Sequence, residues 1–290
     1  MNHHHKGVAL VLVLWIIVLL SVIGISHSRN VRLDMQIARH NVEHAKAMAL
    51  AETGVSRAIY ELFNNNEETR WLFNGQVYQM SMPEGEVQIM IRNTAGLVDI
   101  NTATPAVLET LFSGVQIDQD ERSALVDAIM DWKDSDDLKR LNGAEDADYK
   151  QKGLDYGTPD RPFFSIGELR YVIGMNTAIY NTISPYITVF SGQSSINQSF
   201  APEELSNLFS GAEGITLGSK LENNIQMPID NMQQDQLPTD LVPGDTTKVF
   251  HISTWATVSS GAVAGLEVDV DTTQRSGDVY TILSWQESSQ

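Results

Sequence analysis

The chain has 290 residues, of which 42% are hydrophobic and 19% charged, so it is long enough for one large domain or two modest ones and is not a disordered polymer. Its formal net charge is −18, from 19 Lys and Arg against 37 Asp and Glu. A body this acidic repels nucleic-acid phosphate and attracts divalent cations. The lack of cysteine excludes disulfides, thiolate chemistry and cysteine-based zinc sites.

The amino-terminal segment divides into a short polar leader, residues 1–7, and an apolar run, residues 8–28. The run contains no Lys, Arg, Asp or Glu. A membrane-spanning helix needs about 20 apolar residues, so the run predicts a transmembrane helix. A cleaved signal peptide is the alternative, but its apolar core is only ~7–15 residues long and ends at a small-residue cleavage site. That site is represented here only weakly, by Ser26-His27-Ser28.

The helical pattern continues beyond the apolar run. Apolar residues recur mostly three or four positions apart from Met35 to Leu62, and no Pro interrupts residues 8–63. This predicts one helix of roughly 80 Å, at 1.5 Å per residue. Its first half would lie in lipid, and its second half would pack an apolar stripe against a domain. A membrane anchor joined to an ordinary amphipathic helix is the plainer interpretation.

Alternating apolar and polar residues predict strands at both ends of the remaining chain. Residues 77–82 and 87–92 flank Pro83-Glu84-Gly85 and predict a β-hairpin. Three further strands are expected at 249–258, 263–270 and 279–285. Together they indicate an antiparallel sheet packed on the second half of the long helix, which is an α+β fold. The pilin-like body would then comprise residues 29–100 and 186–290.

An inserted all-α domain is expected between the two groups of strands, at 101–185. Helices are predicted at 105–112, 120–132 and 166–173, and Thr104-Pro105 is a good helix start because a capping residue precedes Pro in the first turn. A faint repeat relates Ile100-Asn101 and Pro105 to Ile196-Asn197 and Pro202. Residues 210–247, rich in Asn, Gln, Asp and Pro, predict a long loop.

An acidic cluster within the insertion is the strongest candidate for chemistry. Hard divalent cations prefer carboxylate and carbonyl oxygens, and Asp134 and Asp136 have a spacing that often places two carboxylates on one cation. The segment is not an EF-hand, because Leu138 and Lys139 stand where that loop needs a ligand and a Gly. A solvated acidic loop without metal is the alternative. The cluster comprises Asp131, Asp134, Asp136, Asp137, Glu145, Asp146 and Asp148.

Catalysis has little support, and we expect that the chain is not an enzyme. No Gly-x-Ser-x-Gly elbow, phosphate-binding loop or His-Glu-x-x-His helix occurs. Residues 101–108 resemble the opening of DNA-binding helix-hairpin-helix domains, which makes a membrane-anchored DNA-uptake protein the alternative function. However, the expected hairpin at 114–118 has one Gly, and Asp118 and Asp120 add charge of the wrong sign. We therefore expect no nucleic-acid binding.

Several segments together resemble the type IV pilin-like proteins, and within them the K-type minor pseudopilins of type II protein secretion. The leader ending in Lys6-Gly7, the apolar helix beginning at the next residue and AlaLeuAlaGluThrGly at 49–54 resemble pilins. The motifs that resemble the K-type are AspIleAsnThrAla at 99–103, AspTrpLysAspSerAsp at 131–136, AsnGlyAlaGlu at 142–145 and IleGlyGluLeuArg at 166–170, together with the large α-domain that interrupts the sheet.

The resemblance implies a processing and assembly route. A prepilin peptidase would cut between Gly7 and Val8 and methylate the new amino terminus. The mature chain would be a single-pass bacterial inner-membrane protein with its carboxyl-terminal domain in the periplasm. Most pilins carry Glu at the fifth mature position, where this chain has Leu12. Such a Glu would neutralise a neighbour's buried amino terminus, so its absence fits a subunit at the fibre tip.

The resemblance also implies partners and a metal. The chain would nucleate or cap a periplasmic pseudopilus together with the I-type and J-type minor pseudopilins, other pseudopilins and the inner-membrane secretion platform. Calcium would stabilise the acidic loop. The ligands expected from the resemblance are Asp134, Asp136, Glu145 and Asp148, followed by Asp131 and Asp146.

Overall fold

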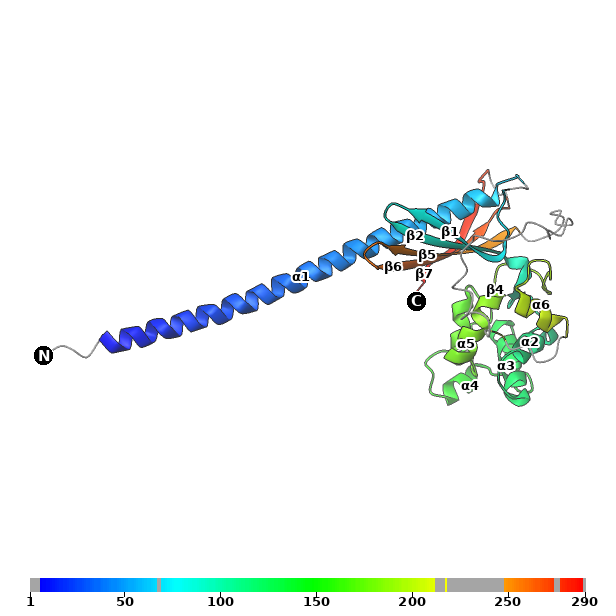
Figure 1. Cartoon of the computed structure of the whole chain (residues 1–290). Helices are drawn as coiled ribbons and strands as arrows, with labels where there is room; N and C mark the ends of the chain where they lie inside the picture. Colours follow the sequence, from blue (N-terminus) through cyan, green and yellow to red (C-terminus); the bar gives the residue numbers. More distant parts are fainter. Residues whose placement is uncertain (1–5, 67–68, 212–216, 218–247, 274–276, 289–290) are drawn as a thin grey trace.

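The structure, a computed structural model, describes residues 6–66, 69–211, 217, 248–273 and 277–288. For 6–10 and 23–33 it describes the backbone alone. Figure 1 shows three parts: a long helix, a sheet packed along the last part of that helix, and a group of short helices beyond the sheet at the end of the molecule far from the amino terminus. The α+β architecture predicted from the sequence is confirmed.

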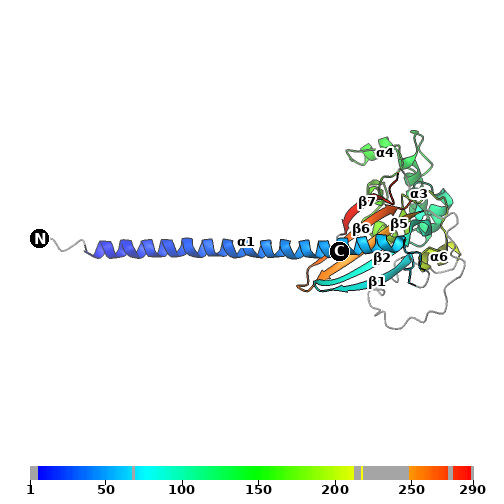
Figure 2. The ribbon, with the colours of Figure 1, turned by 90° about the horizontal axis from the view of Figure 1, so that it is seen from above.

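The long helix α1 is continuous from Lys6 to Leu62. Its amino-terminal part projects away from the rest of the molecule, as Figures 1 and 2 both show. Large apolar side chains between Val11 and Val22 are 47–69% exposed, so the described part of the chain leaves them largely uncovered. Among the described residues no helix has the length and apolar character that crossing a membrane requires. The side chains at 8–10 and 23–28, within the expected transmembrane segment, lie outside the described residues.

A five-stranded antiparallel sheet lies along the last part of α1 (Figure 1). Its strands, in spatial order, are β1 (Asn74–Met82), β2 (Gly85–Asn93), β5 (Val249–Val258), β6 (Val263–Asp271) and β7 (Thr281–Ser288). Residues alternate between the two faces, so Val87, Ile89 and Ile91 of β2 are all buried in the core shared with α1. The alternation that predicted these strands is therefore the pattern that builds this core.

Small residues on one face of α1 allow the helix to approach the sheet closely. Ala47, Ala51 and Ala58 are 0% exposed in the core that α1 forms with the sheet. Gly54 shares this face, and a Cβ added there would lie 2.7 Å from Val87 Cγ1. Because real Cβ atoms do not come so close to a carbon, a larger residue at this position would push the helix away from β2.

The helical domain has a separate hydrophobic core that runs from Val98 to Leu217. Its α-helices are α2 (Pro105–Ser113), α3 (Gln119–Lys133), α4 (Asp146–Gln151), α5 (Thr177–Ile183) and α6 (Glu203–Phe209). Its 3₁₀ turns are η2 (Ile166–Tyr171) and η3 (Ser184–Tyr186), and η1 (Thr94–Gly96) lies just before it. Because α6 contributes Leu205 and Leu208 to this core, the helical core includes chain beyond residue 185, where the insertion was expected to end.

A polar neck forms the base of the helical domain. The chain passes through it before α2 and again after η3, and α6 then packs on the helical core. Strands β3 (Val98–Asp99) and β4 (Ile187–Thr188) pair in parallel at this point. The buried Asp99 accepts hydrogen bonds from Gly192 N at 2.7 Å and Ser191 Oγ at 3.2 Å. The Lys133 ammonium donates to the carbonyl oxygens of residues 100, 101 and 103 at 2.7, 3.1 and 3.4 Å. Burial lowers the pKa of Lys133 to about 8. These bonds fix the base of the domain.

The remaining expectations differ in detail. The third predicted helix, 166–173, is the 3₁₀ turn η2, and the last strand begins at Thr281 rather than at 279. Helices α4, α5 and α6 are additional, and α6 follows Pro202, where the faint sequence repeat occurs. Most of the loop expected at 210–247, and leader residues 1–5, lie outside the described residues.

The packing of α1 on the sheet generates the first prediction. Ala51→Leu places a large side chain where the native residue is 0% exposed, and we expect it to lower the free energy of unfolding by about 1–3 kcal/mol. Ala49→Leu, an exposed site on the same helix, is the matched control and should change stability by less than ~0.5 kcal/mol. Denaturant unfolding of the full chain in detergent measures both. Equal effects would contradict the contact described.

Candidate metal site in the helical domain

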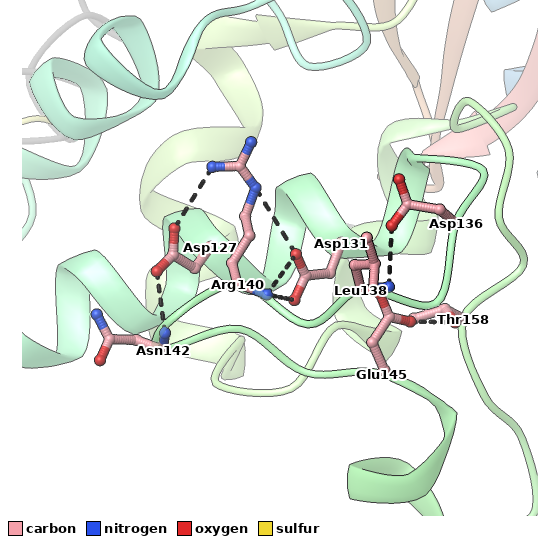
Figure 3. Close-up of polar contacts among 8 residues, drawn as sticks. All are labelled: Asp127, Asp131, Asp136, Leu138, Arg140, Asn142, Glu145 and Thr158. Carbon is pink, nitrogen blue, oxygen red and sulfur yellow. Dashed lines mark hydrogen bonds and ion pairs between the residues drawn. The ribbon is translucent and has the colours of Figure 1, made fainter.

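The candidate site lies where helix α3 ends and α4 begins, and Figure 3 shows part of it. Asp131 belongs to the last turn of α3, and Asp134 is the residue that caps its carboxyl end. Glu145 is the residue immediately before α4. Asp160, in the next loop, has a left-handed backbone with φ of 51°. Two helix ends and one strained turn therefore bring these four carboxylates into one region.

Asp131 is fully buried and is held by the returning loop. Its Oδ2 accepts a hydrogen bond from Arg140 N at 3.1 Å, and the Arg140 guanidinium lies 3.7 Å from Oδ1 (Figure 3). A Cβ at Gly143 would lie only 1.9 Å from Asp131 Oδ2. Position 143 therefore requires Gly, which explains the Gly in the AsnGlyAlaGlu motif at 142–145. Asp127 supports the same loop by accepting from Asn142 N at 3.1 Å.

Two buried carboxylate oxygens in this region have no hydrogen-bond partner. They are Oδ1 of Asp134 and Oε1 of Glu145, whereas Oε2 of Glu145 accepts from Thr158 Oγ1 at 3.1 Å. A buried polar atom without a partner costs about 1–3 kcal/mol, more if it is charged. Such atoms are natural positions for a bound cation or a proton.

The pKa values of the three carboxyl groups are all raised, which shows that their negative charge is poorly stabilised in this region. Burial raises the pKa of Asp131, and the neighbouring charge of Asp134 adds to that rise. Burial and then the charge of Asp136 raise the pKa of Asp134. Burial raises the pKa of Glu145 to about 7, with further contributions from Asp131, Asp134 and Asp160. The carboxylates thus repel one another, and the charge of Arg140 offsets only part of the rise in the pKa of Asp131 and Asp134.

The other predicted ligands have partners elsewhere. Asp148 accepts from Lys139 Nζ at 2.7 Å and from the backbone N–H of Glu145 at 3.0 Å, and the bond from Lys139 lowers the pKa of Asp148. Asp146 accepts from Thr158 N at 3.0 Å, and its carboxylate lies 3.5 Å from Lys150. Asp148 is therefore engaged by the first turn of α4 and by Lys139, and Asp146 by Thr158 and Lys150.

Asp136 lies in the exposed loop, where it accepts a hydrogen bond from Leu138 N at 2.9 Å. The structure thus groups Asp131, Asp134 and Glu145 and leaves the other three predicted residues in different roles. Over the described ranges, no set of three or more acidic or histidine side chains is arranged so that it could hold a metal ion. The carboxylates must draw closer together to share a cation.

Sequence reasoning missed Asp160. Its only local signal is the turn Pro159-Asp160, which is far from the acidic run along the chain. Asp99 and Asp127 were also missed as structural carboxylates, because nothing in the sequence shows which backbone N–H groups they meet.

The remaining candidate residues lie away from this region. Gly7 and Val8 belong to the first turn of α1, where the structure describes the backbone alone. Leu12 is 57% exposed on the projecting part of α1.

The segment that resembles a helix-hairpin-helix has a different role here. It comprises α2, the turn 114–118 and α3. A Cβ at Gly114 would lie 2.8 Å from Leu217 Cγ, so this Gly serves apolar packing. Asp118 caps α3 through Glu121 N at 2.8 Å, and Asp120 follows. A phosphate approaching this helix start would meet three carboxylates.

Comparisons with known proteins agree with the fold. Residues 91–192 match the family model described as type II secretion system protein K, and residues 6–56 match the model described as PilX N-terminal. A type II secretion system protein K of Klebsiella pneumoniae is 26% identical over 215 residues, 67% of this chain and 65% of that relative. A putative protein K of Escherichia coli K12 is 25% identical over 229 residues, 72% of this chain and 70% of that relative. The match to the first relative therefore spans just under two thirds of its length.

A solved structure shares the fold. It is a chain of the GspK-GspI-GspJ complex from the type 2 secretion system of enterotoxigenic Escherichia coli, with a TM-score of 0.56 and 15% sequence identity. The likeness covers 90% of this chain and 100% of that one.

The raised pKa of Glu145 gives a prediction for the metal-free protein. Because its value in the folded state, about 7, lies above the ordinary 4.5, the folded chain retains a proton that the unfolded chain loses between these values. Stability in the presence of a chelator should therefore fall as the pH rises through this window. Glu145→Gln should flatten the fall and raise the unfolding midpoint at about pH 8.

The matched control for this titration is Asp155→Asn, at an exposed carboxylate of the same domain. It should leave the pH profile unchanged when thermal unfolding is followed by circular dichroism. A profile that Glu145→Gln leaves as steep as that of the unaltered chain would show that Glu145 does not carry the effect.

Proposed function

We propose that this chain, which belongs to the type II secretion system protein K family, is a minor pseudopilin that forms or nucleates the tip of a periplasmic pseudopilus. The observation that supports the role most directly is the arrangement of its parts. A helix of 57 residues carries a sheet on its last part and a helical domain at the far end, while its amino-terminal part projects free (Figure 2). The role is architectural, and we propose no catalytic activity.

The projecting part of α1 is the proposed anchor and assembly surface. Residues 8–28 carry no charged side chain, and the described ones from Val11 to Val22 are exposed. Exposed apolar surface of this extent is stable only in lipid or against other apolar helices. We propose cleavage after Gly7 by a prepilin peptidase, methylation at Val8, and a single span of the inner membrane with the folded body in the periplasm.

Leu12 is the feature that supports the proposed tip position. A subunit within a fibre must neutralise the buried amino terminus of its neighbour, because an unpaired charge in an apolar interior is costly. Leu12 offers no charge for this purpose. A tip subunit has no such neighbour above it, and the helical domain, which lies at the opposite end from the amino terminus (Figure 1), would cover the end of the fibre.

The proposed partners are I-type and J-type minor pseudopilins. The solved complex that shares this fold is named for a GspK-GspI-GspJ assembly, and we extend that association to this chain. Other pseudopilins and the inner-membrane secretion platform would complete the assembly.

Calcium is the proposed structural ion of the acidic region. The donor chemistry fits, because buried oxygens of Asp134 and Glu145 lack partners and because burial, followed by the charges of neighbouring carboxylates, raises the pKa of both groups. Asp131, Asp134, Glu145 and Asp160 would hold the ion, which prefers six to eight oxygen ligands and accepts irregular geometry. A divalent charge would relieve the repulsion and tie the end of α3 to the start of α4.

The calcium proposal predicts a ligand-dependent stability. Calcium at 100 times its dissociation constant should raise the free energy of unfolding by about 2.7 kcal/mol. Asp134→Asn should reduce this gain sharply, because it removes the charge of a carboxylate whose buried Oδ1 has no hydrogen-bond partner. Asp137→Asn, an exposed neighbour, should retain it. Thermal unfolding with and without calcium tests both. No calcium dependence in the unaltered chain would refute the proposal.

The tip assignment is tested by locating the chain in assembled fibres. Pseudopili are isolated from cells that carry a carboxyl-terminally tagged chain and are labelled with gold-conjugated antibody. Electron microscopy should find label at one end of each fibre. Label distributed along the shaft would contradict a tip position, and label absent from fibres would contradict incorporation. Deleting the chain should abolish or strongly reduce secretion.

A further inference from the structure

The loop that joins α3 to α4 exposes two leucines to an unusual degree. Every residue of 135–142 is exposed. Within it Leu138 is 77% exposed and Leu141 is 93% exposed, the two most exposed large apolar side chains among those that the structure describes. Isolated exposed leucines are common on protein surfaces and need no explanation by themselves. Leu138 and Leu141, however, lie three positions apart in one loop, and neither is even partly covered by the core of its own domain.

The backbone around these leucines is held in place by carboxylates (Figure 3). Asp136 accepts a hydrogen bond from the N–H of Leu138 itself at 2.9 Å. On either side of Leu141, Arg140 N donates to Asp131 at 3.1 Å and Asn142 N donates to Asp127 at 3.1 Å. The loop is therefore fixed by α3 and cannot turn its leucines toward the domain without breaking these bonds.

The charge around the leucines indicates what covers them. Lys139 is paired with Asp148 at 2.7 Å, and Arg140 lies 3.9 and 3.7 Å from two carboxylates of α3. Asp136 and Asp137 form no ion pair with any described residue, so the free charge beside Leu138 is negative. A second copy of this chain, with a net charge of −18, would be repelled, and so would an anionic lipid surface.

We infer that loop 135–142 is a docking surface for a protein whose apolar pocket receives Leu138 and Leu141 and whose rim carries Lys and Arg. Burying two leucines supplies the affinity, and the basic rim opposite Asp136 and Asp137 supplies orientation and a faster encounter. This goes beyond the proposed function, because it identifies a contact of the helical domain that is independent of the fibre contacts of α1. A rigid apolar anchor within a charged rim is typical of sites that carry binding energy.

The test uses a photoreactive amino acid at position 138 or 141 of the full chain in its native membrane. Irradiation of intact cells should join the chain to the same protein from both positions, and mass spectrometry should place the joined residue beside Lys or Arg. The double change Asp136→Lys and Asp137→Lys should lower the yield of this adduct at least about fivefold. The matched change Asp155→Lys and Asp278→Lys, at exposed sites elsewhere, should leave the yield unchanged.

A probe at the exposed Tyr60, at the end of α1, controls for random collision, because it lies outside the loop and should not give this adduct. The inference is overturned if positions 138 and 141 join to no protein, only to lipid, or only to another copy of this chain. It is equally overturned if the loop charge reversal leaves the yield intact. Gold labelling of fibre ends is a separate readout, so a chain that reaches the tip but forms no such adduct refutes the docking surface alone.

Discussion

The close packing of α1 on the five-stranded sheet is the contact on which the rest of the molecule depends. Alanines at 47, 51 and 58 and the glycine at 54 make one face of the helix nearly smooth, so that β2, β5 and β6 approach it directly. Because this contact uses only the last part of a straight 57-residue helix, the amino-terminal part remains available to contact lipid or other helices. The single helix α1 thus joins the apolar amino-terminal segment to the folded domains without a linker.

The helical domain is positioned through a second constraint, the polar neck. Its two crossings of the neck are paired as β3 and β4 and are fixed by Asp99 and Lys133, which are buried or half-buried. Arg92 of β2 adds a bond to Pro185 O at 3.0 Å, which ties the sheet to the end of the domain. Since buried polar groups are costly unless they are paired, these bonds favour a single orientation. An acidic region and an exposed leucine loop are therefore held at a defined end of the molecule.

The sequence predicted the parts that depend on local pattern. The period-two alternation located β5 at its observed bounds, and the absence of Pro with apolar spacing of three and four predicted α1 to within two residues. Helices α4 and α5 were missed because each has only six or seven residues, too few for a periodic signal. The acidic run indicated Asp131, Asp134 and Glu145, but which carboxylates have partners depends on loop closure. Asp148 is hydrogen-bonded to Lys139 and to the start of α4, and Asp146 is hydrogen-bonded to Thr158. Asp160 lies in a separate turn, outside the acidic run.

The central claim, that this chain is a processed pilin-like subunit, is tested most directly by its intact mass and amino-terminal sequence. The chain would be isolated from its native membrane, with and without the prepilin peptidase. The account predicts a mature protein that begins at methylated Val8 only when the peptidase is present. A chain that retains Met1 under both conditions, or one cut near Ser28, would contradict it.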